Sequence, residues 1–147
     1  MQRHRIRSLD DLQSFAREIA SGLQGGEVLG LIGDLGAGKT TFTQMLAQEL
    51  GVHSGVKSPT FVLMQVYETG PIAAIRGIRQ MCHVDAYRLK DMHELETIGF
   101  ADYKAKKDTV TVVEWADRVP ELHEENGYIE LTFTFGEGDE RMLVKGR

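Results

Sequence analysis

The spacing of apolar residues near the start of the chain predicts an amphipathic helix. Leu9, Leu12, Ala16, Ile19 and Leu23 recur at intervals of three or four residues, which places them on one face of a helix over residues 9–22. A serine before this stretch and acidic residues in its first turn are typical of a helix start, and a pair of glycines follows its end. The helix therefore has one face for a core and one face for solvent.

Short apolar and β-branched runs further along the chain predict the strands of a sheet. Strands are expected at residues 28–32, 61–67, 81–85 and 109–113, in a closing hairpin of residues 128–135 and 140–144, and at an edge near Ile6 within residues 1–7. Helices are expected at residues 41–50 and 91–98, a charged turn or helix at 102–107, and a long hairpin connection at 68–80. With 147 residues and no repeat or low-complexity segment, we expect one domain over residues 1–147.

Composition narrows the class of protein. The hydrophobic content of 41% and the charged content of 27% are ordinary for a globular protein, and the net charge of −5 argues against an extensive direct grip on nucleic acid. The single cysteine, Cys82, cannot form an internal disulfide and is expected to be a small buried hydrophobic residue. No apolar run reaches the length of a membrane span. We therefore expect a cytoplasmic protein.

One segment carries a recognisable chemistry. Residues Gly33 to Thr40 fit the phosphate-loop pattern G-x-x-x-x-G-K-[ST] at every fixed position, between a predicted strand and a predicted helix. Glycines allow successive backbone N–H groups to turn around a phosphate, and the helix N-terminus favours negative charge. In this pattern Lys39 reaches the β- and γ-phosphates, and the Thr40 hydroxyl is a ligand for Mg²⁺. The sequence therefore predicts a nucleotide-binding site.

Two acidic residues follow predicted strands and extend this hypothesis. Asp85 and Glu114 stand at the carboxyl ends of their strands, where open α/β sheets bind ligands and where phosphate-loop enzymes place a Mg²⁺-organising acid. Either residue by itself is also compatible with an ordinary strand end. The Ser58–Thr60 segment is compatible with two interpretations: a capped turn, or a switch that touches the γ-phosphate or Mg²⁺.

Four sequence blocks together resemble one family. They are Gly33-Asp34-Leu35-Gly36-Ala37-Gly38-Lys39-Thr40-Thr41-Phe42, Val56-Lys57-Ser58-Pro59-Thr60-Phe61, His83-Val84-Asp85-Ala86-Tyr87-Arg88 and Val113-Glu114-Trp115. In this order they resemble the TsaE family, the ATPase component of tRNA threonylcarbamoyladenosine biosynthesis in bacteria. The resemblance covers most of the chain. It implies an α/β fold of the P-loop NTPase type, with a single domain and a mixed β-sheet flanked by helices.

The resemblance also implies cofactors, partners and site residues. It implies that the protein binds ATP and Mg²⁺ and hydrolyses ATP in a complex with TsaD and TsaB, through which it meets tRNA. Because the phosphate loop and the Ser58–Thr60 segment contain no arginine, we expect slow hydrolysis by the protein alone and activation by its partners. It assigns catalytic roles to Lys39, Asp85 and Glu114, and Mg²⁺ binding to Thr40 and Glu114. The nucleotide-binding residues that it implies are Leu35, Gly36, Ala37, Gly38, Lys39, Thr40, Thr41, Trp115, Asp117 and Arg141.

Other functions fit parts of the pattern. A small-molecule kinase would use the same phosphate grip but needs an acceptor pocket and lid arginines, whereas Arg88, Arg118 and Arg141 are scattered. A non-catalytic nucleotide sensor would bind ATP without turnover. A GTPase is disfavoured because the chain lacks an N-K-x-D motif, and the five histidines show no spacing of a zinc site. Trp115 is also compatible with a core aromatic residue.

Overall fold

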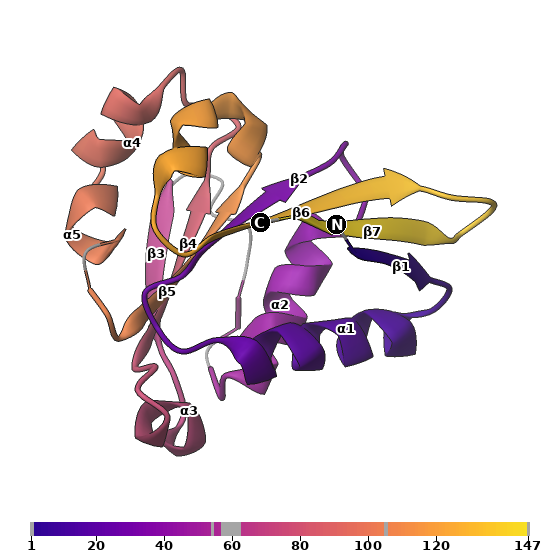
Figure 1. Cartoon of the computed structure of the whole chain (residues 1–147), viewed down its shortest axis with the longest axis horizontal. Helices are drawn as coiled ribbons and strands as arrows, with labels where there is room; N and C mark the ends of the chain where they lie inside the picture. The colour runs from indigo at the N-terminus through magenta and orange to yellow at the C-terminus, as the bar shows by residue number, and fades with distance from the viewer. Residues whose placement is uncertain (1, 54, 57–62, 105, 147) are drawn as a thin grey trace.

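The computed structural model describes residues 2–53, 55–56, 63–104 and 106–146, and it has a mixed β-sheet with helices on both faces (Figure 1). The strands are β1 (Gln2–Ile6), β2 (Val28–Ile32), β3 (Met64–Glu68), β4 (Gln80–Asp85), β5 (Thr109–Glu114), β6 (Tyr128–Phe135) and β7 (Arg141–Gly146). The α-helices are α1 (Leu9–Gly22), α2 (Lys39–Glu49), α3 (Pro71–Ile75), α4 (Met92–Thr97) and α5 (Phe100–Lys104), and the 3₁₀ helices are η1 (Ala116–Arg118) and η2 (Pro120–Glu124). The expected fold class is confirmed.

The strand order puts β2, the strand that precedes the phosphate loop, in the middle of the sheet. The seven strands lie in the order β1-β7-β6-β2-β5-β4-β3. β2 runs parallel to both β5 and β6, and β5 runs parallel to β4, whereas β1, β3 and β7 pair antiparallel with their neighbours. Because β2, β4 and β5 are parallel, their carboxyl ends meet at one edge of the sheet. That edge carries the candidate site.

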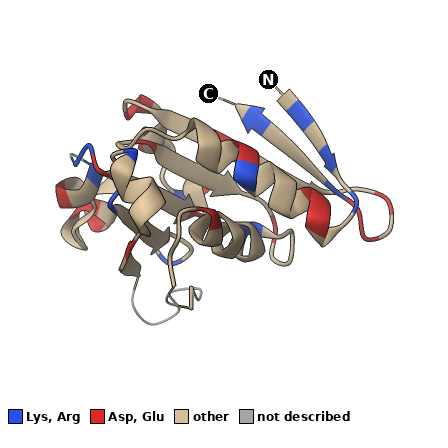
Figure 2. Ribbon diagram, turned by 90° about the horizontal axis from the view of Figure 1, so that it is seen from below, with Lys and Arg blue, Asp and Glu red and all other residues tan. Residues whose placement is uncertain are grey.

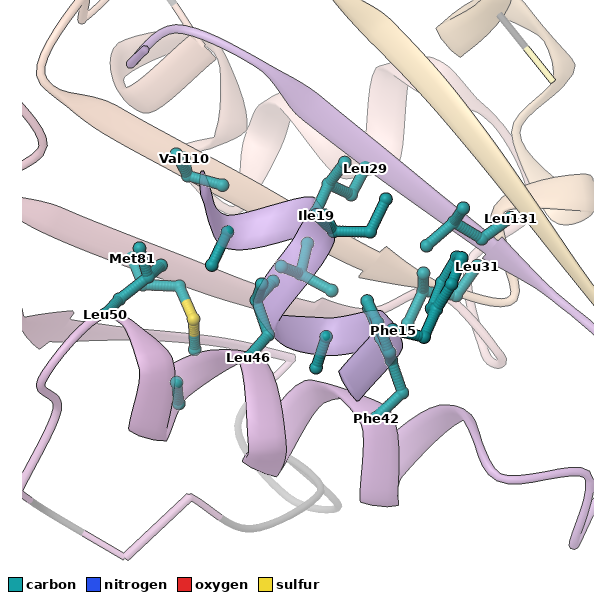
Figure 3. Close-up of a cluster of buried hydrophobic side chains, with 14 of the residues drawn as sticks. Phe15, Ile19, Leu29, Leu31, Phe42, Leu46, Leu50, Met81, Val110 and Leu131 are labelled. Atoms are coloured by element: carbon teal, nitrogen blue, oxygen red, sulfur yellow. The ribbon is translucent and has the colours of Figure 1, made fainter. Parts of the chain in front are cut away.

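Helices α1 and α2 cover one face of the sheet through a shared apolar core. Phe15 of α1 and Phe42 of α2 lie with their ring centroids 5.8 Å apart, and Phe42 lies 5.7 Å from Phe133 of β6. Figure 3 shows Phe15 and Phe42 in the same cluster of buried side chains as Leu29 and Leu31 of β2. Burial of this cluster fixes α2 beneath β2, and it therefore fixes the direction in which the loop between them points.

The short helices α4, α5, η1 and η2 cover the other face (Figure 1). Leu95, Phe100 and Leu122 are fully buried there against apolar residues of β4 and β5. Cys82 belongs to this core, and burial raises the pKa of its thiol to about 12, so the thiol stays protonated near neutral pH. The expectation that Cys82 is a small buried residue is confirmed.

Most predicted elements lie where the pattern put them. Ser8 caps α1, because its Oγ accepts a hydrogen bond from the backbone N–H of Asp11 at 3.1 Å. Leu9 differs from its predicted place on the apolar face, since it is 67% exposed at the first turn. The strand expected at residues 61–67 is β3, which begins at Met64, and residues 61 and 62 lie outside the described ranges. The two 3₁₀ helices were not predicted.

The connection at residues 68–80 does join a hairpin, and it contains a helix that the sequence pattern did not reveal. β3 and β4 pair antiparallel with Glu68 opposite Gln80, and α3 lies between them. The backbone N–H of Gly70 donates to the carbonyl of Leu50 at 2.9 Å, where α2 ends. The guanidinium of Arg76 donates to three carbonyls at the end of α1: Ala20, Ser21 and Leu23, at 3.1, 3.1 and 2.8 Å. The connection therefore ties the far ends of α1 and α2 together.

No helix in the described ranges has both the length and the apolar character needed to cross a membrane.

Replacing Gly30 by alanine should lower the free energy of unfolding by about 1–3 kcal/mol, the usual cost of overpacking a core. A Cβ at Gly30, in the middle of β2, would lie 2.2 Å from the hydroxyl oxygen of Tyr128. That ring cannot move aside freely, because Tyr128 is buried and its hydroxyl donates to Glu130 at 3.1 Å. Denaturant unfolding followed by circular dichroism measures the effect. Gly22→Ala is the control, because a Cβ there meets nothing within 4 Å. A Gly30→Ala midpoint equal to that of the wild type would contradict this packing.

Candidate functional site

The loop between β2 and α2 turns its backbone through conformations that favour glycine. Gly33, Gly36 and Gly38 have φ angles of +154°, +81° and +109°. A Cβ at Gly33 would lie 2.6 Å from the carbonyl oxygen of Phe133, so a side chain does not fit there. Gly38 caps α2 without a side-chain hydrogen bond, which leaves N–H groups of the first turn to meet a ligand. The loop therefore has the backbone of an anion-binding turn.

A hollow of about 430 Å³ opens between this loop and the carboxyl ends of β4 and β5. The loop and α2 contribute most of its lining, and the segments that follow β4 and β5 contribute the rest. The lining residues are Leu35, Gly36, Gly38, Lys39, Thr40, Thr41, Asp85, Tyr87, Glu114 and Trp115. Of these, only Tyr87 was not assigned to the site from the sequence. The structure therefore brings together three predicted segments that are far apart in the chain.

Glu114 ends β5 inside this hollow, buried and hydrogen-bonded through both carboxylate oxygens. Its Oε1 accepts a hydrogen bond from the Thr40 hydroxyl at 2.8 Å, and its Oε2 lies 2.5 Å from Nε2 of His83. Only 3% of Glu114 is exposed. A buried carboxylate next to the phosphate-loop hydroxyl is a pair of oxygen donors, which is the donor type that Mg²⁺ prefers. Thr40 and Glu114 therefore fit the metal-binding role expected of them.

Asp85 lies beside Glu114 on the neighbouring strand. The two residues are register partners of the parallel β4–β5 pair, and the N–H of Ala86 donates to the carbonyl of Glu114 at 3.0 Å. The Oδ1 of Asp85 accepts from the backbone N–H of Tyr87 at 2.9 Å. Both carboxylates therefore face the same hollow from adjacent strand ends, as the sequence predicted.

Lys39, the first residue of α2, keeps its ammonium group over the loop. The Nζ atom donates to the carbonyls of Gly33 and Asp34, the latter at 3.0 Å, and it lies 4.1 Å from the ring centroid of Trp115. These contacts hold the positive charge at the mouth of the loop, over an aromatic face that attracts cations.

The charge state of Lys39 depends on two opposing effects. Burial lowers the pKa of its ammonium from the ordinary value, because a low-dielectric surrounding disfavours the charged form. Nearby carboxylates oppose that shift: Glu114, Asp117, Asp34 and Asp85. The acidic cluster of the site thus stabilises the cation that would meet a phosphate.

Trp115 adopts a backbone conformation that the sequence did not reveal. Its φ and ψ angles of 60° and 41° are left-handed, which is rare for a bulky residue and is often found at functional sites. The bend directs the chain into η1 and leaves the indole between Lys39 and Tyr87, whose ring centroid is 4.9 Å away. The guanidinium of Arg118 also lies over the ring of Tyr87, 5.1 Å from its centroid. Tyr87 thus extends the aromatic wall of the hollow. Its position two residues after Asp85 is the sequence feature from which its place in the site could have been predicted.

A second hollow of about 360 Å³ lies on the other side of the loop. Gly36, Gly38 and Thr41 line both hollows, and Ala37 and Arg141 line only the second. The wall is completed by the start of α1 and by the β6–β7 hairpin.

Arg141 is held in place at the second hollow. Its guanidinium donates to the carbonyls of Asp139 and Glu140 at 3.0 Å each, reaches the carbonyl of Gly36 at 3.5 Å, and lies 4.5 Å from the ring centroid of Phe135. Asp117 lines neither hollow. The switch segment expected at Ser58–Thr60 lies outside the described residues.

Comparison with known proteins gives one consistent result. Residues 6–143 match the family model described as threonylcarbamoyl adenosine biosynthesis protein TsaE. The chain is 41% identical over 115 residues to the tRNA threonylcarbamoyladenosine biosynthesis protein TsaE of Aquifex aeolicus, a match that covers 77% of this chain and 75% of the relative. The relative of the same name from Streptomyces coelicolor is 36% identical over 131 residues, covering 86% of this chain and 82% of the relative.

A solved structure has a similar fold. The crystal structure of YdiB from Bacillus subtilis matches with a TM-score of 0.69 at 27% sequence identity, covering 97% of this chain and 82% of that one. The range matched by the family model contains every residue that lines the two hollows.

Proposed function

This chain belongs to the TsaE family and is therefore a protein of tRNA threonylcarbamoyladenosine biosynthesis, and from that premise we propose that it binds ATP with Mg²⁺ and hydrolyses it. The observation that carries the proposal is the hydrogen bond of 2.8 Å from Thr40, the last residue of the phosphate-loop pattern, to Glu114. It joins the hydroxyl of the loop pattern to a buried carboxylate from another strand. A glycine-rich turn that binds no nucleotide has no use for a hydroxyl and a buried carboxylate held side by side.

The residues of the first hollow suit the phosphates of ATP. The N–H groups of the glycine-rich turn and the Lys39 ammonium would meet negative charge, and Thr40 and Glu114 would hold Mg²⁺. When bound, Mg²⁺ neutralises charge on the phosphates during transfer. Asp85, the register partner of Glu114, would orient the attacking water. This division of roles is the one that phosphoryl transfer requires.

The second hollow suits the rest of the nucleotide. Because the two hollows share Gly36, Gly38 and Thr41, one molecule that lies across the loop reaches both. Arg141 and the apolar residues of the second hollow would then contact the nucleoside part, while Trp115 stays near the phosphates beside Lys39. The proposed roles of Ala37 and Arg141 follow from this arrangement. Asp117 lines neither hollow, and its negative charge favours the charged form of Lys39.

We further propose that turnover depends on the TsaD–TsaB pair. Among the described residues, Lys39 is the one cation that lines the first hollow, whereas phosphoryl transfer gains much from an additional positive charge. Figure 2 shows acidic residues spread among basic ones, with basic residues on the two strands beside the termini. The net charge of −5 favours docking on a protein over direct capture of tRNA. A partner protein that supplies a positive charge to the first hollow would complete the site.

ATP with Mg²⁺ should change the fluorescence of Trp115, which is the single tryptophan of the chain and lies in the first hollow. Titration of the purified protein, checked by calorimetry, gives the affinity with and without Mg²⁺. Thr40→Ser keeps the hydroxyl and should bind like the wild type, whereas Thr40→Ala should lose the part of the affinity that depends on Mg²⁺. Wild-type behaviour of Thr40→Ala, with its Mg²⁺ dependence intact, would contradict the proposed site.

A further inference from the structure

We propose that His83 is the positioning residue for the Glu114 carboxylate, an inference that rests on the proposed function of the site. His83 lies on β4, opposite Val112 of β5 in the parallel register. Since alternate residues of a strand share a face, Glu114 follows Val112 on the face where His83 lies. The His83 side chain is fully buried and that of Glu114 is 4% exposed, so their contact is shielded from water. In the described part of the chain His83 does not line the hollow, and its hydrogen bond to a residue of the site is the one to Glu114.

The surroundings of the imidazole decide which nitrogen donates. Nε2 lies 2.5 Å from Oε2 of Glu114, whereas Nδ1 is buried and has no hydrogen-bond partner in the described part of the chain. A proton on Nδ1 would be a buried donor without an acceptor, which is costly. The proton therefore belongs on Nε2, and His83 donates to the carboxylate.

This hydrogen bond fixes the orientation of the carboxylate. His83 holds Oε2 and Thr40 holds Oε1, so the plane of the carboxylate cannot rotate without breaking one of the two bonds. With Oε2 held by the imidazole, Oε1 remains directed at the Thr40 hydroxyl, where Mg²⁺ would bind. Removal of such an outer partner typically costs ~10–100-fold in metal affinity. His83 thus acts on the metal and leaves the glycine-rich grip on the phosphates unchanged.

The test compares the affinity for ADP with Mn²⁺ against the affinity for ADP without metal, both measured by calorimetry on the full chain. His83→Leu removes the donor and should reduce the gain in affinity that Mn²⁺ provides by about tenfold or more, with metal-free ADP binding unchanged. His83→Gln carries an N–H at nearly the same reach as Nε2 and should restore most of the gain. A wild-type Mn²⁺ gain in His83→Leu, or a loss in His83→Gln as large as in His83→Leu, would overturn the inference.

Two further variants separate positioning from folding. His83→Asn is polar but too short to reach Glu114, so it should lose the Mn²⁺ gain even if His83→Leu does not fold, as judged by circular dichroism. In a Glu114→Gln background the His83 substitutions should have no further effect, because His83 acts through that carboxylate; a second full loss there would overturn the inference. Absence of any nucleotide binding by the wild type would instead overturn the proposed function itself.

Discussion

Lys39→Ala should reduce ATP hydrolysis by about 10²–10³-fold or more, measured with the TsaD–TsaB pair present. The ammonium group is held over the loop by the carbonyls of Gly33 and Asp34 and by the face of Trp115. A charge fixed in advance at that place stabilises the β- and γ-phosphates as their charge spreads in the transition state. Alanine removes this charge, and no other lysine or arginine among the described residues lines the hollow to replace it.

The matched control for this variant is Lys107→Ala, which removes an exposed lysine just before the start of β5, at the opposite end of that strand from the site. It should hydrolyse ATP like the wild type. Near-normal turnover in Lys39→Ala would show that the loop does not grip the transferred phosphate. The phosphate-loop assignment would then be wrong, even though the glycine geometry is suitable.

Asp85→Asn and Glu114→Gln should each lower turnover by ~10²-fold or more while leaving the affinity for metal-free nucleotide unchanged. The two carboxylates are register partners at the ends of β4 and β5, and Glu114 is in addition bonded to Thr40. Their negative charge is needed to organise the metal and the attacking water, whereas most of the binding contacts come from the loop. Steady-state hydrolysis and calorimetry on the same samples separate turnover from affinity.

Glu124→Gln, at an exposed position of η2, is the control for the loss of one negative charge. It should leave both quantities unchanged. If Asp85→Asn hydrolyses ATP at the wild-type rate in the assembled complex, Asp85 is structural, with its bond to the N–H of Tyr87 as its role. The same outcome for Glu114→Gln would remove the carboxylate on which the account of the metal rests.

The parts of the site that were predictable from the sequence are those fixed by short spacing. The Gly33–Thr40 pattern specifies its own backbone, because positive φ angles at Gly36 and Gly38 are available to glycine alone at little cost. Asp85 and Glu114 were identified because each directly follows a β-prone run, and parallel strands bring such ends together.

The remaining features depend on contacts between distant segments. The bond from His83 to Glu114 requires the register of β4 against β5, which no local pattern encodes. The left-handed backbone of Trp115 is imposed by the turn into η1 and is unfavourable for the residue itself. The second hollow is assembled from β1, α1, the loop and the β6–β7 hairpin, so Arg141 comes beside Gly36 only in the folded chain.

The same distinction applies to the fold. The apolar spacing of α1 and the β-branched run of β5 identified those elements, whereas α3, at five residues, is too short to show a helical period. Leu9 has the spacing of a core residue but lies at the first turn of α1, where it remains exposed beside the second hollow.

The most direct test of the central claim is the steady-state rate of ATP hydrolysis by this chain alone, with the TsaD–TsaB pair, and with tRNA alone. Lys39 is the single cation lining the first hollow in the described ranges, so the account predicts slow turnover alone and marked stimulation by the protein pair. It predicts no stimulation by tRNA without the pair. Fast turnover by the isolated chain, or stimulation by tRNA alone, would contradict the account and indicate an independent enzyme.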